Sequence, residues 1–249
     1  MPGTPHIEVS NLTMAYGDFV VQHDLNFVVQ KGDIFIIMGG NGCGKTTLMR
    51  ALVGLQKPAA GTVYYEGEDF WNVSANDQER LKRRFGVMFQ GGALWSSLSL
   101  AENVALPLHE YTCLAQARID EIVSFKLALV GLAGFEDFYP AELSGGMRKR
   151  AGLARAMALD PDILVVDEPS SGLDPLNARH LDDLIVELRD GLGTTIVVVT
   201  HELASILSIG SNSIYLDAET HTMIATGNPQ QAAQTGEAKV RHFLSRGEL

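Results

Sequence analysis

A glycine-rich stretch at residues 39–47 follows an apolar segment, residues 34–38, and leads into residues 47–53, which have helical spacing. It contains a glycine, four further residues and then Gly-Lys-Thr, a spacing typical of loops that bind nucleotide phosphates. Glycines let backbone N–H groups turn toward an anion, and the following helix adds the positive end of its dipole. We predict a buried strand, a phosphate-binding loop and a helix. The loop consists of Gly39, Gly40, Asn41, Gly42, Cys43, Gly44, Lys45, Thr46 and Thr47.

Two side chains of this loop have the chemistry that a nucleoside triphosphate requires. Lys45 is expected to reach the β- and γ-phosphates, and Thr46 is expected to offer its hydroxyl to Mg²⁺, a hard cation that accepts oxygen ligands. The alternative is a turn that binds nothing, which requires the whole pattern to arise by chance at a strand–helix junction. The loop alone does not distinguish between the classes of nucleotide hydrolase and kinase.

Composition narrows the remaining classes. The chain has 249 residues, 46% of them hydrophobic and 20% charged, which is ordinary globular composition for one large or two unequal lobes. Its formal net charge of −11 disfavours a nucleic-acid partner. The amino terminus lacks the features of a secretory signal, and no apolar stretch is long enough to span a bilayer, so we expect a cytosolic chain. Cys43 and Cys113 form no Cys-x-x-Cys pair, which argues against a zinc site or a disulfide.

The segments around the loop predict a β region followed by a helical lobe. Residues 7–14 alternate between apolar and polar, a turn follows at residues 16–18, and further strands are expected at 19–29 and 61–65. Tyr16, on that turn, has the chemistry either to stack on a base or to pack on its own hairpin. Residues 76–84 favour a helix, residues 85–90 favour a strand that ends at Gln90, and residues 98–134 favour a helical lobe.

A second helix N-terminus that can receive an anion begins at Ser144, a natural N-cap followed by Gly145 and Gly146. The next residues separate into a face directed at the core and a basic flank, which we interpret as solvated. The core face consists of Met147, Ala151, Ala154 and Ala158, and the flank consists of Arg148, Lys149, Arg150 and Arg155.

Two further apolar segments end in polar residues. Residues 163–166 lead into Asp167 and Glu168, as expected for a parallel strand that is buried on both faces and delivers chemistry at its carboxyl end. Asp167 can hold Mg²⁺, and Glu168 can deprotonate an attacking water. Residues 194–200 predict another buried strand, so His201 should reach the same sheet edge and sense the γ-phosphate. A structural His and two solvated acids are the simpler alternatives.

Together these motifs resemble the ATPase subunit of ATP-binding cassette (ABC) transporters, in the family's order, from about residue 7 to residue 227. The resemblance implies an α/β fold: a P-loop NTPase with a RecA-like core, an antiparallel β subdomain and an α-helical subdomain. It implies a domain at residues 1–235, with the helical subdomain at about 91–158, and a tail at 236–249. The matching positions are Tyr16 (adenine stacking), 39–47 (Walker A), Gln90 (Q-loop), 143–147 (signature), 163–167 (Walker B), Glu168 (base), 171–174 (D-loop, with Asp174 at the nucleotide) and His201 (switch).

The resemblance also implies a mechanism. ATP and Mg²⁺ are the expected cofactors, with the metal on Thr46, Gln90 and Asp167 and the catalytic groups Lys45, Glu168 and His201. Two copies of the chain are expected to dimerise head to tail. Residues 144–146 of one copy would then close over the ATP that the other copy holds.

Three residues depart from the family pattern: Gly40, Cys43 and Met147. None of the three removes a phosphate ligand, a metal ligand or the base, so hydrolysis is still expected. Because Cys43 lies at the positive end of a helix, we predict a lowered thiol pKa and inactivation by alkylation.

The stretches 89–95, 99–108, 143–150 and 203–209 look like the cassettes of lipid transporters that are built around an MCE (mammalian cell entry) protein. This branch implies a peripheral protein on the cytoplasmic face of the inner membrane, with an integral-membrane permease, an MCE-domain protein and a small regulatory subunit as partners. Leu94, Trp95 and Leu98 are candidates either for contact with the permease or for burial in the helical lobe. Residues 230–249 predict a short helix, with a frayed tail as the alternative.

Three other functions stay open on sequence alone. An ABC ATPase for another cargo would share every motif above. A soluble ABC ATPase of DNA repair or translation would typically carry a coiled-coil insertion, zinc cysteines or a second cassette, and the sequence shows none of these. A regulatory subunit that does not hydrolyse ATP would lack the base or the switch, yet Glu168 and His201 are present.

Overall fold

The computed structural model describes residues 4–246 and contains two β-sheets. A six-stranded sheet has the order β10-β9-β3-β8-β7-β6, and a four-stranded antiparallel sheet has the order β2-β1-β4-β5. The strands are β1 (Ile7–Tyr16), β2 (Phe19–Val29), β3 (Ile34–Met38), β4 (Ala60–Tyr65), β5 (Glu68–Asp69), β6 (Phe85–Met88), β7 (Ile163–Asp167), β8 (Thr195–Val199), β9 (Asn212–Asp217) and β10 (Thr222–Gly227).

The six-stranded sheet is parallel from β9 to β6, and only β10 runs antiparallel to its neighbour. Every residue of β3, β7 and β8 is buried, which explains why these strands are continuous apolar runs and do not alternate. The strand predicted at residues 85–90 is shorter than expected. It ends at Met88, and Gln90 begins a 3-10 turn, η1 (Gln90–Gly92).

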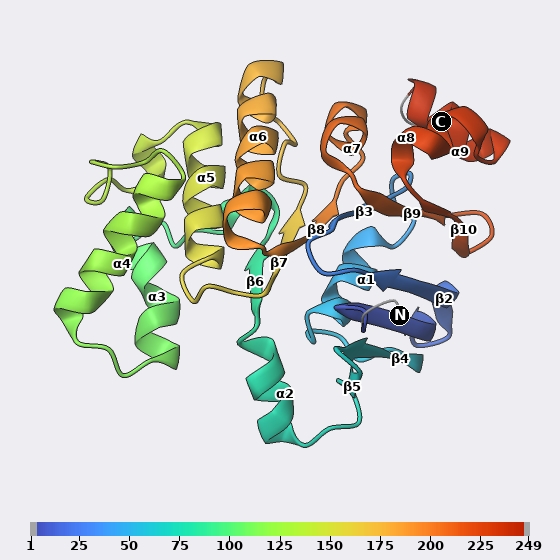
Figure 1. Ribbon diagram of the computed structural model, residues 1–249, viewed down its shortest axis with the longest axis horizontal. Coiled ribbons are helices and arrows are strands. Elements are labelled where there is room, and N and C mark those ends of the chain that lie inside the picture. The colour runs from blue at the N-terminus through green and yellow to red at the C-terminus, as the bar shows by residue number, and fades with distance from the viewer. Residues whose placement is uncertain (1–3, 247–249) are drawn as a thin grey trace.

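Helices cover the sheet and form a separate lobe. Figure 1 shows α3, α4 and α5 at one end of the molecule and the four-stranded sheet at the other. The helices are α1 (Lys45–Leu52), α2 (Ala75–Lys82), α3 (Leu100–Tyr111), α4 (Gln116–Leu129), α5 (Gly145–Ala156), α6 (Pro175–Leu192), α7 (Leu203–Ile209), α8 (Pro229–Thr235) and α9 (Ala238–Arg246), with a further 3-10 turn, η2 (Pro140–Glu142).

Two apolar cores lie on opposite faces of the six-stranded sheet. Ile34 and Ile36 of β3 pack with the residues of α3 to α6, whereas Phe35 and Ile37 pack with α1 and the four-stranded sheet. Side chains of a strand point alternately to its two faces, so β3 contributes to both cores. The predicted α/β fold with an antiparallel β region and a helical lobe is confirmed, and the proposed domain limits stay predictions.

The carboxyl end is a packed element of this fold. Val240, Phe243 and Leu244 of α9 are buried, and the Phe243 ring meets the Tyr215 ring of β9 at 5.1 Å between centroids. The expectation of a short helix is confirmed, and the frayed-tail alternative is wrong as far as residue 246. The rest of that expected tail, residues 247–249, lies outside the described residues.

Between residues 4 and 246, each helix falls short of the length or the apolar character that crossing a membrane requires.

Candidate nucleotide-binding and hydrolysis site

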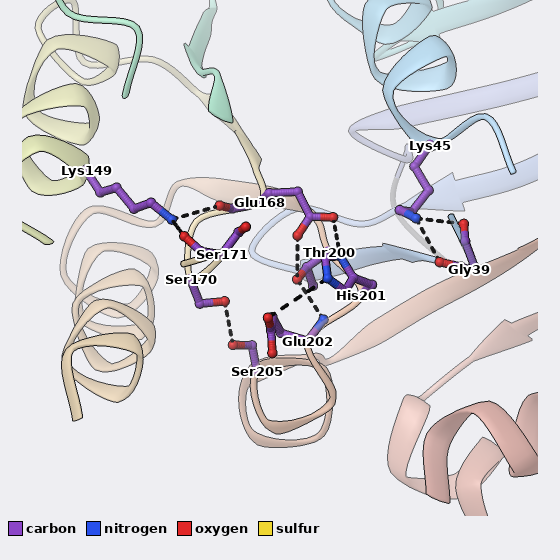
Figure 2. Close-up of polar contacts among 11 residues, drawn as sticks. Gly39, Lys45, Lys149, Glu168, Ser170, Ser171, Thr200, His201, Glu202 and Ser205 are labelled. Atoms are coloured by element: carbon purple, nitrogen blue, oxygen red, sulfur yellow. Dashed lines mark hydrogen bonds and ion pairs between the residues drawn. The ribbon is translucent and has the colours of Figure 1, made fainter. Parts of the chain in front are cut away.

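The carboxyl ends of β3, β7 and β8 meet at one edge of the large sheet and bring the predicted polar residues together. Asp167 lies beside Val199, and the backbone N–H of Glu168 donates to the carbonyl of Val199 at 2.8 Å. The N–H of Thr200 donates to the carbonyl of Ile37 at 3.2 Å. The phosphate loop, the two carboxylates and His201 therefore share one edge, as predicted, and Figure 2 shows Lys45 and His201 there.

The glycine-rich loop has the backbone shape of an anion cradle. Gly42 and Gly44 adopt φ values of 74° and 98°, in the left-handed region that favours glycine. Gly44 is the N-cap of α1 and has no side chain with which to cap it, so the first N–H groups of the helix can face an anion. Lys45 Nζ donates to the carbonyls of Gly39 at 2.8 Å and Gly40 at 2.9 Å, which holds its charge over the loop.

Cys43 does not behave as the sequence suggested. Its side chain is buried, and this burial raises the thiol pKa more than the nearby Lys45 charge lowers it. The predicted lowered pKa is wrong, because desolvation of a thiolate here outweighs the positive end of the helix. Cys113 is exposed, so alkylation should reach that thiol before Cys43.

Asp167 has the environment of a metal ligand. It is 5% exposed, and burial together with the neighbouring Glu168 raises its pKa to about 6, against the opposing charges of Lys45 and Arg50. Among the described residues, none hydrogen-bonds to the buried Asp167 Oδ1. A buried oxygen without a partner is costly unless a cation or a donor satisfies it, so this position fits Mg²⁺.

The other two predicted ligands, Thr46 and Gln90, are exposed. Among residues 4–246, no group of three or more His, Cys, Asp or Glu side chains is arranged to hold a metal ion. A Mg²⁺ ion would therefore depend on oxygens of the nucleotide as well as on these residues. That is usual for this cation, which prefers one or two carboxylates plus phosphates to an all-protein cage.

Glu168 is held in a strained position by its neighbours. Its φ is 48°, in the left-handed region that a residue with a side chain rarely adopts. His201 Nδ1 lies 2.7 Å from Glu168 Oε1, and the Thr200 hydroxyl donates to Oε2 at 3.4 Å, as Figure 2 shows. The carboxylate is thus aimed by β8 and the residues that follow it.

Lys149 supports the same turn from the other side. It is only 6% exposed, and Nζ donates to the carbonyl of Glu168 at 3.3 Å and also to the carbonyl of Ser171. Burial lowers its pKa, against the raising effect of Glu168 and Glu202. Its interpretation as part of a solvated flank is wrong, because α5 packs this side chain against the turn after β7.

Tyr16 and Asp174 keep their proposed nucleotide roles only as predictions. Tyr16 ends β1, is 51% exposed and donates to Gln56 Oε1 at 2.9 Å, while a hydrogen bond with Thr47 lowers its pKa. Asp174 caps α6, because its Oδ1 accepts the N–H groups of Leu176 and Asn177, both at 3.1 Å. The Asn177 side-chain amide donates to Oδ2 at 2.6 Å, and this hydrogen bond, together with those of the cap, lowers the pKa of the Asp174 carboxyl.

The second predicted anion site begins α5. The Ser144 hydroxyl accepts the N–H of Met147 at 3.2 Å, which confirms the expected N-cap. Figure 1 places α5 in the helical lobe and α1 beside the four-stranded sheet, so residues 144–146 and the phosphate loop lie apart within one chain.

Trp95 is 63% exposed in the loop before α3. The burial alternative is wrong for Trp95, whereas Leu94 and Leu98 are partly buried. Asn103 holds this loop: it is fully buried, its Oδ1 accepts the N–H of Trp95 at 2.8 Å, and its Nδ2 donates to the carbonyls of Leu98 at 3.1 Å and Ser99 at 2.9 Å.

A model of the family described as ABC transporter matches residues 22–171, which is more than half of the chain. The chain belongs to the ABC transporter family. It is an ATP-binding subunit and an ATP hydrolase of this family.

Individual relatives match this chain over almost its whole length. The intermembrane phospholipid transport system ATP-binding protein MlaF of Haemophilus influenzae is 42% identical over 97% of this chain and 90% of that protein. The probable ribonucleotide transport ATP-binding protein mkl of Mycobacterium tuberculosis is 39% identical over 96% of this chain and 66% of that protein. The bacterial cassette MJ0796, solved as a dimer, is 28% identical, with a TM-score of 0.80 over 89% of this chain and 98% of that one.

Two buried polar residues of this region are not indicated by the sequence motifs. Lys149 belongs to a basic cluster that favours a solvated flank, and Gln22 matches no motif, although its side chain reaches the phosphate loop. Gln22 lies in a strand with three other polar residues, His23, Asp24 and Asn26, so the sequence gives no sign that its side chain is buried.

Proposed function

We propose that this ATP hydrolase works as a head-to-tail dimer with Mg²⁺ and drives a membrane permease that moves phospholipid. The catalytic part of the proposal rests on the contact between Glu168 and His201 beside the phosphate loop. The cargo rests on the likeness to MlaF, whose name refers to phospholipid transport and which this chain matches along 90% of its length.

Each residue of the sheet edge has a role in this proposal. Lys45 would exchange the loop carbonyls that it now contacts for phosphate oxygens. Glu168 would accept a proton from the attacking water, and its contact with His201 orients the carboxylate for that step. His201 would also hold the γ-phosphate as charge develops on it. When bound to Asp167, Thr46 and Gln90, Mg²⁺ would neutralise phosphate charge.

The separation of the two anion-binding helix ends within one chain supports the proposed dimer. In a head-to-tail pair, Ser144, Gly145 and Gly146 of a second copy would complete the site over Lys45 and Thr46. The dimeric solved relative supports this arrangement. A site that two copies share would couple hydrolysis to their association and dissociation.

The relatives suggest two different cargoes. MlaF and mkl are 42% and 39% identical to this chain, so identity alone separates them weakly. The share of each relative that this chain spans favours phospholipid as the cargo, because the chain spans 90% of MlaF but only 66% of mkl. We extend the proposal to an MCE-domain partner and to a place at the cytoplasmic face of the inner membrane. Trp95 is the proposed permease contact, since it is exposed on a loop that Asn103 holds rigid.

Purification of the tagged Glu168→Gln chain from membranes with Mg²⁺ and ATP tests the proposal. Mass spectrometry should identify an integral-membrane permease, an MCE-domain protein and bound phospholipid. A permease that carries ribonucleotide would replace the cargo, and a chain without any permease would refute the transport role. Trp95→Ala should reduce recovery of the permease, whereas Phe125→Ala, a matched control that is 58% exposed on α4, should not.

A further inference from the structure

Gln22 lies behind the phosphate loop and joins it to a distant strand. Its side chain is fully buried, and Nε2 donates to the carbonyl of Cys43 at 2.7 Å and to the carbonyl of Asp217 at 3.0 Å. Among the described residues, none donates to the buried Gln22 Oε1. Because an unpaired buried oxygen is costly, an apolar residue would suit this position better unless the two donated hydrogen bonds matter.

The phosphate loop also packs closely against the end of β9. A Cβ atom on Gly39 would lie 2.4 Å from the carbonyl oxygen of Leu216, closer than any side chain tolerates. A Cβ atom on Gly44 would lie 2.7 Å from Val21 Cγ1 of β2. A shift of β9 or β2 would therefore change the shape of the phosphate loop directly.

The same end of β9 is fastened to the carboxyl-terminal helix. Lys239 Nζ of α9 lies 2.6 Å from Asp217 Oδ1 and 2.9 Å from Glu219 Oε2. Asp217 is 3% exposed, and its hydrogen bonds with Lys239 and Thr220 outweigh burial and lower its pKa, so the carboxylate stays charged. The packing of Phe243 on Tyr215 joins the two elements a second time, and Figure 1 shows α9 beside β9.

We propose that Gln22 is a positioning residue for nucleotide binding and that the Asp217–Lys239 ion pair extends its effect to α9. Gln22 fixes the Cys43 carbonyl at the turn from which Gly44 and Lys45 present their N–H groups and ammonium to a phosphate. The backbone carbonyl of Asp217 accepts the hydrogen bond from Gln22, and its carboxylate pairs with Lys239 of α9. Docking of the carboxyl-terminal helix thus contributes to ATP affinity, whatever cargo the transporter carries.

Titration of the full-length chain with Mg²⁺ and ATP in a calorimeter tests this proposal. Gln22→Met keeps the approximate side-chain volume and removes both donors. It should raise the Kd for ATP about ten-fold, because hydrogen bonds that shape a loop contribute on the order of that factor. The kcat at saturating ATP should stay unchanged, since the side chain of Gln22 donates to Cys43 and Asp217 and not to Glu168. A variant that binds ATP normally would overturn the proposal.

A double-mutant cycle tests the extension to α9. Lys239→Met should raise the Kd about three-fold in the natural chain and should have no further effect in the Gln22→Met background. Equal effects in both backgrounds would show that α9 acts independently and would overturn this part. Glu219→Gln is the matched control, because Glu219 shares Lys239 but is 82% exposed and has no contact with the phosphate loop among the described residues.

Hydrogen exchange keeps the proposal testable if Gln22→Met does not fold. In the Lys239→Met chain, amides of residues 39–45 should exchange faster than in the Glu219→Gln chain at equal thermal stability. Identical exchange in the two chains would overturn the link between α9 and the loop.

Discussion

The parallel strands of the six-stranded sheet begin at one edge of the sheet and end at the opposite edge. Both edges carry polar residues, but they differ in how fully their charged side chains are paired. At the edge where β6, β7 and β8 begin, a pocket of about 280 Å³ is lined by charged residues that are paired. Arg84 donates to Glu66 at 2.7 Å and to Asp162 at 2.6 Å, and Lys31 also contacts Glu66. His6 Nδ1 lies 2.7 Å from the Thr195 hydroxyl.

The edge where these strands end is different. Asp167 Oδ1 is buried without a hydrogen-bond partner among the described residues, and Glu168 has a left-handed backbone. The pKa values reflect the contrast: Lys31 and Arg84 lower that of Glu66 to about 2, whereas burial raises that of Asp167 to about 6. A charged pocket is therefore a weak sign of a site. Groups that stay unsatisfied or strained are a stronger one.

The largest expected effect concerns the proposed base. Glu168→Gln should lower kcat by about 10²- to 10⁴-fold, because general base catalysis contributes on that order. The Kd for ATP should change little, since the phosphate loop is intact. Glu66→Gln, the same change at the opposite edge, is the control and should leave kcat unchanged. Equal losses of ATPase activity in the two variants would break the distinction between the edges.

The next effect is a pH dependence at Asp167. Its folded-state pKa is about 6, above its unfolded value, so the folded chain binds the extra proton. This group's contribution to stability therefore falls as pH rises from about 4 to 6. Mg²⁺ requires the carboxylate, so Mg²⁺-dependent ATP affinity should fall as pH drops below 6.

Substitution separates this titration from that of ATP itself. Asp167→Asn should weaken Mg²⁺-dependent binding and flatten its dependence on pH. Asp182 of α6, whose pKa burial also raises to about 6, is the matched control, because Asp182→Asn should keep the pH profile of binding. If Asp182→Asn flattened the pH dependence of ATP binding and Asp167→Asn did not, the assignment of Asp167 as a Mg²⁺ ligand would be contradicted.

A smaller effect is expected at Lys149, which stabilises the left-handed Glu168 through that residue's carbonyl. Lys149→Met should lower kcat about ten-fold and leave the Kd for ATP unchanged, since it loosens the base but not the loop. Arg150→Met is the control, because Arg150 Nη1 donates to the carbonyl of Val130 at 3.1 Å in the helical lobe. A matching loss of kcat in both variants would indicate a general effect on α5.

The smallest effect concerns the paired edge. Glu66→Gln should lower the free energy of unfolding at pH 7 by about 1 kcal/mol, a modest value because solvent screens this partly exposed carboxylate. The lowered pKa means that its contribution is present above the unfolded pKa and disappears as pH falls toward 2. Urea unfolding at pH 7 and pH 3 measures both effects. A stability gap between the natural chain and the variant that widens at pH 3 would contradict this assignment.

The contrast between the edges also explains what could be predicted from the sequence. Lys45, Glu168 and His201 each follow an apolar strand, and parallel strands end at a common edge, so their convergence was predictable. Gln22 and Asp217 are 195 positions apart, and no local pattern indicates their contact. The burial of Lys149 and of Cys43 likewise depends on packing between distant elements, so no local pattern indicates it.

A structure of the Glu168→Gln chain with Mg²⁺ and ATP tests the central claim most directly. We predict two copies with the phosphates on residues 39–47, the metal near Asp167 and Thr46, and Ser144 of the second copy over the nucleotide. Nucleotide bound in the pocket beside Arg84, or held by one copy without residues 144–146 of another, would contradict the account.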